Sequence, residues 1–215
     1  MRLPVTMTSD FICPWCFIGE RRLLRAIESL PAGVHVDLSY RPFELNPDMP
    51  AEGLARREYR TAKFGSWARS QAMDAQVAAV GEADGIAFNY DRVARTPNTL
   101  VAHRLMWLAA IEGTDQMRFG DRLFTAFFTE GLNLSDKAVL RRIATEGGLP
   151  ADRTDAILDG PEGEQDVRAL VASAYSRGIQ GVPLFEIGSM AISGAQPAAA
   201  LAEALRRAAG SLAAA

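Results

Sequence analysis

The chain has 215 residues, of which 48% are hydrophobic, and a formal net charge of -3 with acidic and basic residues interspersed. This length and apolar content can bury a sizeable core, so we expect one large domain or a domain with an insertion. Nucleic acid is excluded as a partner because no basic stripe is present, and we expect no membrane-spanning helix because no run of about 18 apolar residues occurs.

The first predicted element is a short strand over residues 3–8, which are apolar and partly β-branched and precede a turn at Ser9-Asp10. This stretch is too short and too interrupted to be the apolar region of a secretory signal, so we expect a cytoplasmic protein. In a reducing compartment, two closely spaced cysteines are more typical of catalysis or metal binding than of a structural disulfide.

The only two cysteines stand three residues apart in Cys13-Pro14-Trp15-Cys16, at the head of a helical pattern. Pro14 suits the first helical position, which makes Cys13 the N-cap. Unpaired backbone N–H groups and the helix dipole stabilise a thiolate at this place, so we expect Cys13 to be reactive at neutral pH. The motif therefore indicates thiol-disulfide chemistry.

The helix that starts at the cysteines is expected to end at Pro31, with Leu23 and Ile27 on its apolar face and Glu20 largely on the polar side. Residues 34–43 alternate between apolar and polar side chains and predict a second strand. A proline-rich loop over residues 44–51 follows.

From residue 52 to 178 the sequence changes to amphipathic stretches, with no alternation strong enough to predict a strand among them. We expect helices over 52–64, 66–83, 98–112, 116–129, 135–146, 150–158 and 162–177. Two short strands at 184–187 and 190–193 and a helix over 197–209 complete the chain, and residues 211–215 are expected to fray.

Six segments together resemble one known family. They are residues 10–19 (DFICPWCFIG), 41–47 (RPFELNP), 63–65 (KFG), 98–105 (NTLVAHRL), 181–183 (GVP) and 193–197 (SGAQP). The order of elements is that of the thioredoxin superfamily, and the segments look like the FrnE-like branch of the DsbA family. The similarity runs along nearly the whole chain.

The resemblance implies an α/β protein, a thioredoxin fold with a large all-helical insertion between the second and third strands. Residues 1–50 and 178–215 would form the thioredoxin-like domain, and residues 51–177 the insertion. The last helix of the insertion, about 162–177, would pack as the crossover helix of the thioredoxin unit.

The resemblance also implies site residues and an activity. Cys13 would attack a disulfide, and Cys16, one turn further and more enclosed, would resolve the mixed disulfide. A cis bond between Val182 and Pro183 would lie beside the sulfurs and offer backbone groups to an extended substrate, while Pro14 and Trp15 would tune the redox potential. The implied protein is a thiol-disulfide oxidoreductase or isomerase acting on protein thiols and disulfides or on glutathione as co-substrate, without a bound cofactor, as a monomer or homodimer.

Two further residues have alternative interpretations. Asn98 either caps the helix that follows it or is supplied to a substrate or glutathione, as in similar insertions of related isomerases. Asp10 either caps the turn before Cys13 or shuttles a proton to it.

Other functions remain open at this stage. A zinc site needs two more ligands, and His35 and His103 are isolated, so we expect no metal. One alternative is a glutathione-dependent isomerase or transferase acting on an aromatic small molecule, although such proteins usually carry serine where Cys13 stands. Another is a chaperone-like binding module whose cysteines act as a redox switch.

Overall fold

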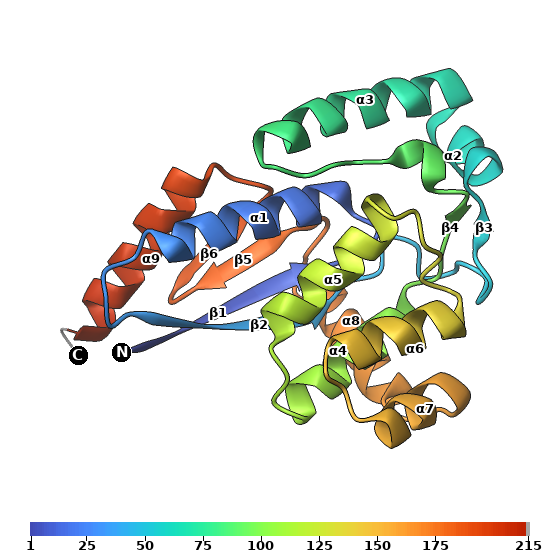
Figure 1. Cartoon of the computed structure of the whole chain (residues 1–215). Helices are drawn as coiled ribbons and strands as arrows, with labels where there is room; N and C mark the ends of the chain where they lie inside the picture. Colours follow the sequence, from blue (N-terminus) through green and yellow to red (C-terminus); the bar gives the residue numbers. More distant parts are fainter. Residues whose placement is uncertain (214–215) are drawn as a thin grey trace.

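A four-stranded mixed sheet forms the centre of the computed structural model, which describes residues 1–213 (Figure 1). Its strand order is β2-β1-β5-β6. The parallel pair β1 and β2 is joined through α1, and β5 and β6 add in antiparallel orientation. The strands are β1 (Arg2–Ser9), β2 (His35–Pro42), β5 (Leu184–Ile187) and β6 (Met190–Ser193).

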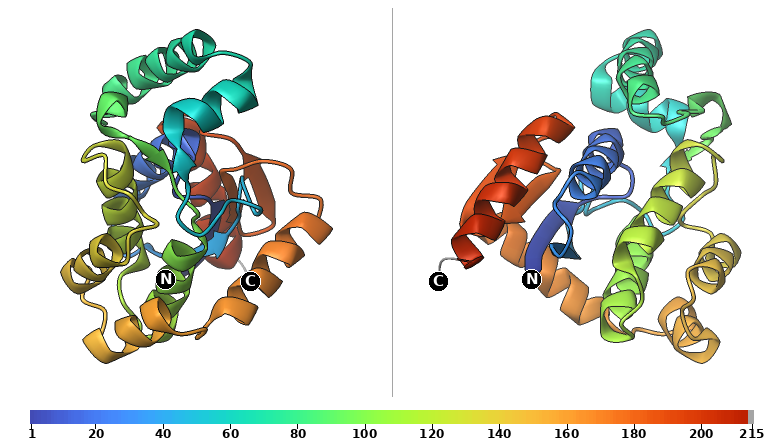
Figure 2. Two further views of the ribbon diagram at one scale, coloured as in Figure 1. Left: turned by 90° about the vertical axis from the view of Figure 1, so that its right-hand side faces the viewer. Right: turned by 60° about the vertical axis from the view of Figure 1, so that its left-hand side comes forward.

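Helices α1 (Pro14–Glu28) and α9 (Ala198–Ala213) lie side by side, and α9 also contacts β1 and β5 (Figure 2). The prediction that the end of the chain frays is wrong for residues 211–213, which continue α9; residues 214 and 215 lie outside the described residues. Alanine is the strongest helix former and no proline interrupts this segment, which explains the extension.

The expected helices of the insertion are all present between β2 and β5. They are α2 (Arg56–Phe64), α3 (Trp67–Ala83), α4 (Leu100–Ile111), α5 (Gln116–Phe128), α6 (Lys137–Glu146), α7 (Ala151–Asp159) and α8 (Glu164–Ser176). Three of their starts are fixed by side-chain caps on backbone N–H groups, from Ser66, Asp115 and Asp136. The last helix, α8, packs against β2 and α4.

The expectation that no strand interrupts the helical block is wrong. The two-residue strands β3 (Leu54–Ala55) and β4 (Arg95–Thr96) pair in antiparallel orientation, so α2 begins at residue 56 and not at 52. A short 3-10 helix, η1 (Tyr90–Arg92), precedes β4. Strands of two residues are too short to show the alternation on which a sequence prediction depends.

Aromatic rings join the insertion to the thioredoxin unit in a single core. The Phe124 ring of α5 lies 5.3 Å from the Phe17 ring of α1 and 5.3 Å from the Phe11 ring of the preceding turn. Phe17 also stacks on Phe128, with centroids 6.0 Å apart. Because rings at these distances are close-packed, the insertion is held against the start of α1.

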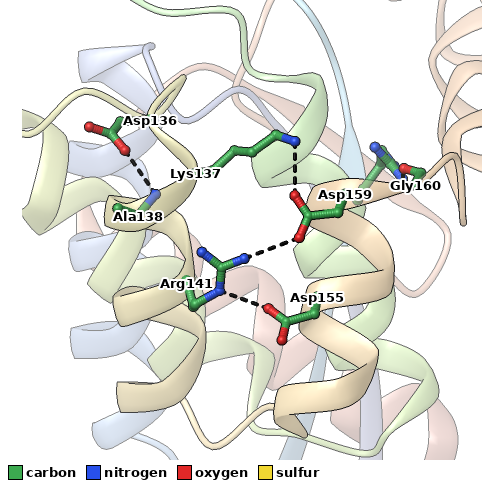
Figure 3. A network of polar contacts seen from close by, with 8 residues as sticks. Asp136, Lys137, Ala138, Arg141, Asp155, Asp159 and Gly160 are labelled. Atoms are coloured by element: carbon green, nitrogen blue, oxygen red, sulfur yellow. Dashed lines mark hydrogen bonds and ion pairs between the residues drawn. The ribbon is translucent and has the colours of Figure 1, made fainter.

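A network of charged side chains joins α6 to α7 (Figure 3). Lys137 contacts Asp159 at 3.0 Å, and Arg141 contacts Asp155 at 2.7 Å and Asp159 at 3.3 Å. These side chains are exposed, so the network contributes little net stability, and the buried apolar residues between the two helices hold them together. Among residues 1–213, no helix has the length and apolar character needed to cross a bilayer.

Candidate active site

The two cysteines stand at the start of α1, and Cys13 is its N-cap, as predicted. The Cys13 N–H donates to the Asp10 carbonyl oxygen at 2.9 Å, which closes the turn after β1. The amide of Cys16 donates back to the Cys13 carbonyl oxygen at 3.0 Å, so Cys16 lies one helical turn further in. The Cys13 side chain makes no capping hydrogen bond, which leaves its sulfur available for chemistry.

The two sulfurs differ in their surroundings. Cys16 is fully buried, whereas Cys13 keeps 5% of its surface exposed at the wall of a pocket. Burial raises the pKa of the Cys16 thiol well above its usual range, and a hydrogen bond with the Cys13 side chain acts in the same direction, against weaker opposing contacts from Ser9 and the Asp10 backbone. Cys16 is therefore held as a neutral thiol behind Cys13.

The loop between α8 and β5 brings a second backbone segment to the sulfurs. The peptide bond between Val182 and Pro183 is cis, and the Cys13 thiol donates to the Val182 carbonyl oxygen at 3.6 Å. Within residues 1–213, the Val182 N–H makes no hydrogen bond. Gly19 of α1 permits this approach, because a Cβ atom there would lie 3.0 Å from the Pro183 ring.

A pocket of about 350 Å³ opens beside Cys13. The thioredoxin unit contributes the CxxC turn and Val182, and the insertion contributes the opposite wall from α2, α3 and the end of α5. Trp15 is 43% exposed at this pocket. The apolar side chains that complete the lining include Ile12, Leu45, Phe64, Met73, Val77, Phe127 and Phe128.

Charged side chains from α2 and α3 also line this pocket, and the sequence did not single them out as site residues. Asp74 binds Arg56 at 2.6 Å and Arg60 at 2.8 Å, using one carboxylate oxygen for each. Lys63 lies one turn beyond Arg60 and lines the same pocket. The i, i+3 and i, i+4 spacing of Arg56, Arg60 and Lys63 was the available signal, since it places them near one face of α2.

Asp10 is fully buried beneath the CxxC turn and does not line the pocket. Its Oδ2 accepts from the Leu45 N–H at 2.8 Å, and its Oδ1 lies 3.6 Å from Nε2 of His103. These contacts tie the turn to the loop after β2 and to α4. Its role as a proton shuttle stays a prediction.

The structure does not bring Asn98 to the cysteines. Its Nδ2 donates to the Met49 carbonyl oxygen at 2.7 Å, and its Oδ1 accepts from the Leu100 N–H at 2.9 Å at the start of α4. Asn98 lines a separate hollow with Asp48 and Met49. The amide nitrogen and the amide oxygen of Asn98 are therefore both used in structural hydrogen bonds, one to the loop and one at the start of α4.

Glu20 was expected on the polar side of α1, and this is wrong, because its side chain is fully buried. Burial raises the pKa of its carboxyl well above the usual range, while the hydroxyl of Tyr40 donates to Oε1. Its second oxygen, Oε2, has no hydrogen-bond partner. Glu20 follows Cys16 by four residues and thus lies on the same face of α1.

No group of three or more His, Cys, Asp or Glu side chains that could hold a metal ion is found in the part of the chain that the structure describes. Cys13 and Cys16 are both free thiols.

Comparison with known proteins places this geometry in a family. Residues 5–206 match the family described as DSBA-like thioredoxin domain. The protein YwbO of Bacillus subtilis (strain 168), which is described as uncharacterized, is 29% identical over 196 residues, covering 91% of this chain and 92% of YwbO.

Among solved structures, a probable DsbA oxidoreductase, SCO1869 from Streptomyces coelicolor, has a TM-score of 0.85 at 32% identity, over 97% of this chain and 90% of that one. A 2-hydroxychromene-2-carboxylate isomerase has a TM-score of 0.66 at 14% identity over 98% of both chains. The cytosolic disulfide reductase DsbM from Pseudomonas aeruginosa, which has also been solved with GSH, has a TM-score of 0.63 at 20% identity over 95% of this chain and 100% of DsbM. The last two similarities show the fold alone.

Proposed function

Because the chain belongs to the DSBA-like thioredoxin domain family, we propose that it is a thiol-disulfide oxidoreductase that works through a mixed disulfide on Cys13. One observation carries the proposal. Of the two sulfurs, only Cys13 lines the pocket, and Cys16 lies directly behind it in the interior. A substrate can therefore reach Cys13, whereas Cys16 can reach only what Cys13 has captured.

The proposed reaction has two displacement steps. The Cys13 thiolate attacks one sulfur of a substrate disulfide, which forms a mixed disulfide and releases the other sulfur as a thiolate. Cys16 then loses its proton and attacks the Cys13 sulfur, which closes the Cys13–Cys16 disulfide and releases the second substrate thiolate. Two electrons pass from the cysteine pair to the substrate, and the reverse sequence oxidises a substrate dithiol.

The backbone at Val182 suits a positioning role in these steps. Its N–H is free to donate to a substrate backbone carbonyl or to a polar group near the substrate sulfur. Pro14 and Trp15 lie between the sulfurs and line the pocket, so we propose that they tune the redox potential. The expected cytoplasmic location and the FrnE-like branch remain part of this proposal.

The test is to trap the intermediate. In a Cys16→Ser variant, we expect a disulfide substrate to accumulate on Cys13 as a single adduct, detected by intact-protein mass spectrometry and released by dithiothreitol. The matched Cys13→Ser variant keeps Cys16 but should form no adduct, because Cys16 is fully buried. Equal labelling of both variants, or of neither, would contradict the proposed mechanism.

The fold shared with the isomerase and the largely apolar pocket favour one alternative, a glutathione-dependent isomerase acting on an aromatic small molecule. In that reaction the protein sulfur need not form a covalent bond with the substrate. A Cys13→Ser variant that still converts such a compound in the presence of glutathione would favour this alternative over the oxidoreductase.

A further inference from the structure

The pocket beside Cys13 carries an excess of positive charge, although the chain as a whole is acidic with a formal net charge of -3. Three cationic side chains line it, Arg56, Arg60 and Lys63, against the single carboxylate of Asp74. Both oxygens of Asp74 are already used by the two arginines. Of the two positive charges in excess, one stays with the group formed by Arg56, Arg60 and Asp74, and the other lies on Lys63.

Lys63 is held in place by neutral partners. Its Nζ donates to Oδ1 of Asn46 at 2.7 Å and to the hydroxyl of Tyr59 at 2.9 Å. An ammonium group has three donors, so one N–H remains for a ligand. Of the two lysines of the chain, only Lys137 forms an ion pair within residues 1–213. A positioned cation with no counter-charge is suited to bind an anion.

The rest of the pocket restricts what that anion is attached to. A volume of about 350 Å³ lies at the lower end of the range for small-molecule sites, which is roughly 300–1,000 Å³. Its remaining wall is mostly apolar and includes Phe64, Met73 and Phe127. A compact ligand with an apolar body and one acidic group would match both the size and the charge.

We propose that this pocket selects low-molecular-weight disulfides that carry a carboxylate, and that Lys63 is the specificity-determining residue that binds the carboxylate. The inference rests on the proposed function, since it assigns a substrate class to the same sulfur. Cys13 attacks the disulfide of the bound compound, one half leaves as a thiolate, and the other half stays on Cys13 until Cys16 displaces it. The compound gains the two electrons that the cysteine pair loses.

Three simple disulfides with two-carbon arms test the proposal, because they differ mainly in charge. They are 3,3′-dithiodipropionate, which is anionic, bis(2-hydroxyethyl) disulfide, which is neutral, and cystamine, which is cationic. In the Cys16→Ser background, the rate of adduct formation on Cys13 is measured for each by mass spectrometry. The quantity of interest is the rate with 3,3′-dithiodipropionate divided by the rate with cystamine.

The chain offers a matched control, because its only other lysine is Lys137, which pairs with Asp159 between α6 and α7 and does not line the pocket (Figure 3). Lys63→Gln and Lys137→Gln change the net charge equally. We expect Lys63→Gln to lower the rate ratio about fivefold, the upper end for a solvent-accessible ion pair, and Lys137→Gln to leave it unchanged. A Lys63→Arg variant should keep most of the selectivity, which controls for misfolding.

A substitution that changes the general reactivity of Cys13 changes both rates equally and leaves their ratio unchanged. The ratio therefore reports only how the pocket distinguishes the charge of the disulfide. An equal effect of the two glutamine variants, or no effect of Lys63→Gln, would overturn the inference while adduct formation still supports the oxidoreductase. Failure of all three disulfides to modify Cys13 in any variant would instead refute the proposed function, and the inference with it.

Discussion

The buried carboxyl of Glu20 gives the protein a pH-dependent stability that one substitution should remove. Burial raises the pKa of this group in the folded state, and Oε2 has no hydrogen-bond partner. In the unfolded chain the carboxyl titrates near its ordinary value of about 4.3. Between these two pKa values the folded state binds more protons than the unfolded state, so the free energy of unfolding falls as the pH rises.

Within this window, one such group lowers the free energy of unfolding by about 1.4 kcal/mol for each pH unit. Because burial holds the pKa of the folded carboxyl well above its usual range, the loss attributable to Glu20 grows by up to about 1.4 kcal/mol per pH unit once the unfolded carboxyl is ionised, until the folded carboxyl ionises as well. The Glu20→Gln variant has no such titration and keeps an oxygen for the Tyr40 hydroxyl. We expect it to match the parent protein near pH 4 and to become more stable than the parent as the pH rises, by about 1–2 kcal/mol near pH 6, with a melting temperature roughly 2–8 °C higher.

Urea denaturation at a series of pH values, with both thiols kept reduced, measures this difference. Other groups also titrate in the window, including Asp121 and Glu44, whose carboxyl pKa values are raised by burial. The contribution of Glu44 cancels when the variant is subtracted from the parent, whereas the charge of Asp121 raises the pKa of Glu20 and is therefore part of the measured difference. The matched control is Glu28→Gln at the exposed end of α1, which should leave the pH profile unchanged. Parallel profiles for Glu20→Gln and the parent would show that Glu20 is ionised in the folded protein and would refute the reasoning.

Two more substitutions test the contacts of one residue that lines the pocket, Asp74, and of one that lies outside it, Asn98. Asp74→Asn removes the only counter-charge that residues 1–213 provide for the buried Arg56 and for Arg60, so we expect a loss of about 3–5 kcal/mol in urea denaturation, and a loss under 1 kcal/mol would contradict the pairing. Asn98→Ala removes the bond to Met49 and the one at the start of α4, which should lower stability by about 1–3 kcal/mol and leave the rate of adduct formation on the reactive thiol unchanged. A reduced rate at equal folding would restore the predicted binding role of Asn98.

The sequence predicted the positions of the helices and strands because most of them carry strong local signals. Cys13-Pro14 marks a helix start by its own chemistry, and Asp115 and Asp136 cap helices where an amphipathic pattern begins. The pair β3 and β4 left no such signal, since its strands are held by partners about 40 residues away and not by a local pattern. Long-range pairing of two residues is not encoded in any window of sequence.

The cysteine site was predictable for the same reason, whereas the pocket was not. Cys13 and Cys16 are neighbours in sequence, and a helix of known geometry fixes how they are arranged. Lys63 and Asp74 become pocket residues only when α2 and α3 fold back over the CxxC turn, which a sequence pattern does not show. For Glu20 the sequence prediction was wrong for a different reason. Charged side chains are rarely buried, so sequence analysis places Glu20 on the exposed side of its helix, whereas the structure buries it.

This division suggests that the chain encodes its chemistry and its selectivity in separate parts. The proposed attacking residue, Cys13, is the N-cap of α1, and the proposed resolving residue, Cys16, lies in its first turn, whereas the charged side chains of the pocket belong to α2 and α3 of the insertion. The stacking of Phe124 on Phe17 is what keeps the two parts in register, because it packs α5 directly on the helix that carries the cysteines. Changes along α2 can therefore alter which disulfide is accepted while the displacement steps at Cys13 stay the same. If this arrangement is correct, substitutions of the α2 side chains will change the preference among disulfide substrates and leave the reactivity of the Cys13 thiol unchanged.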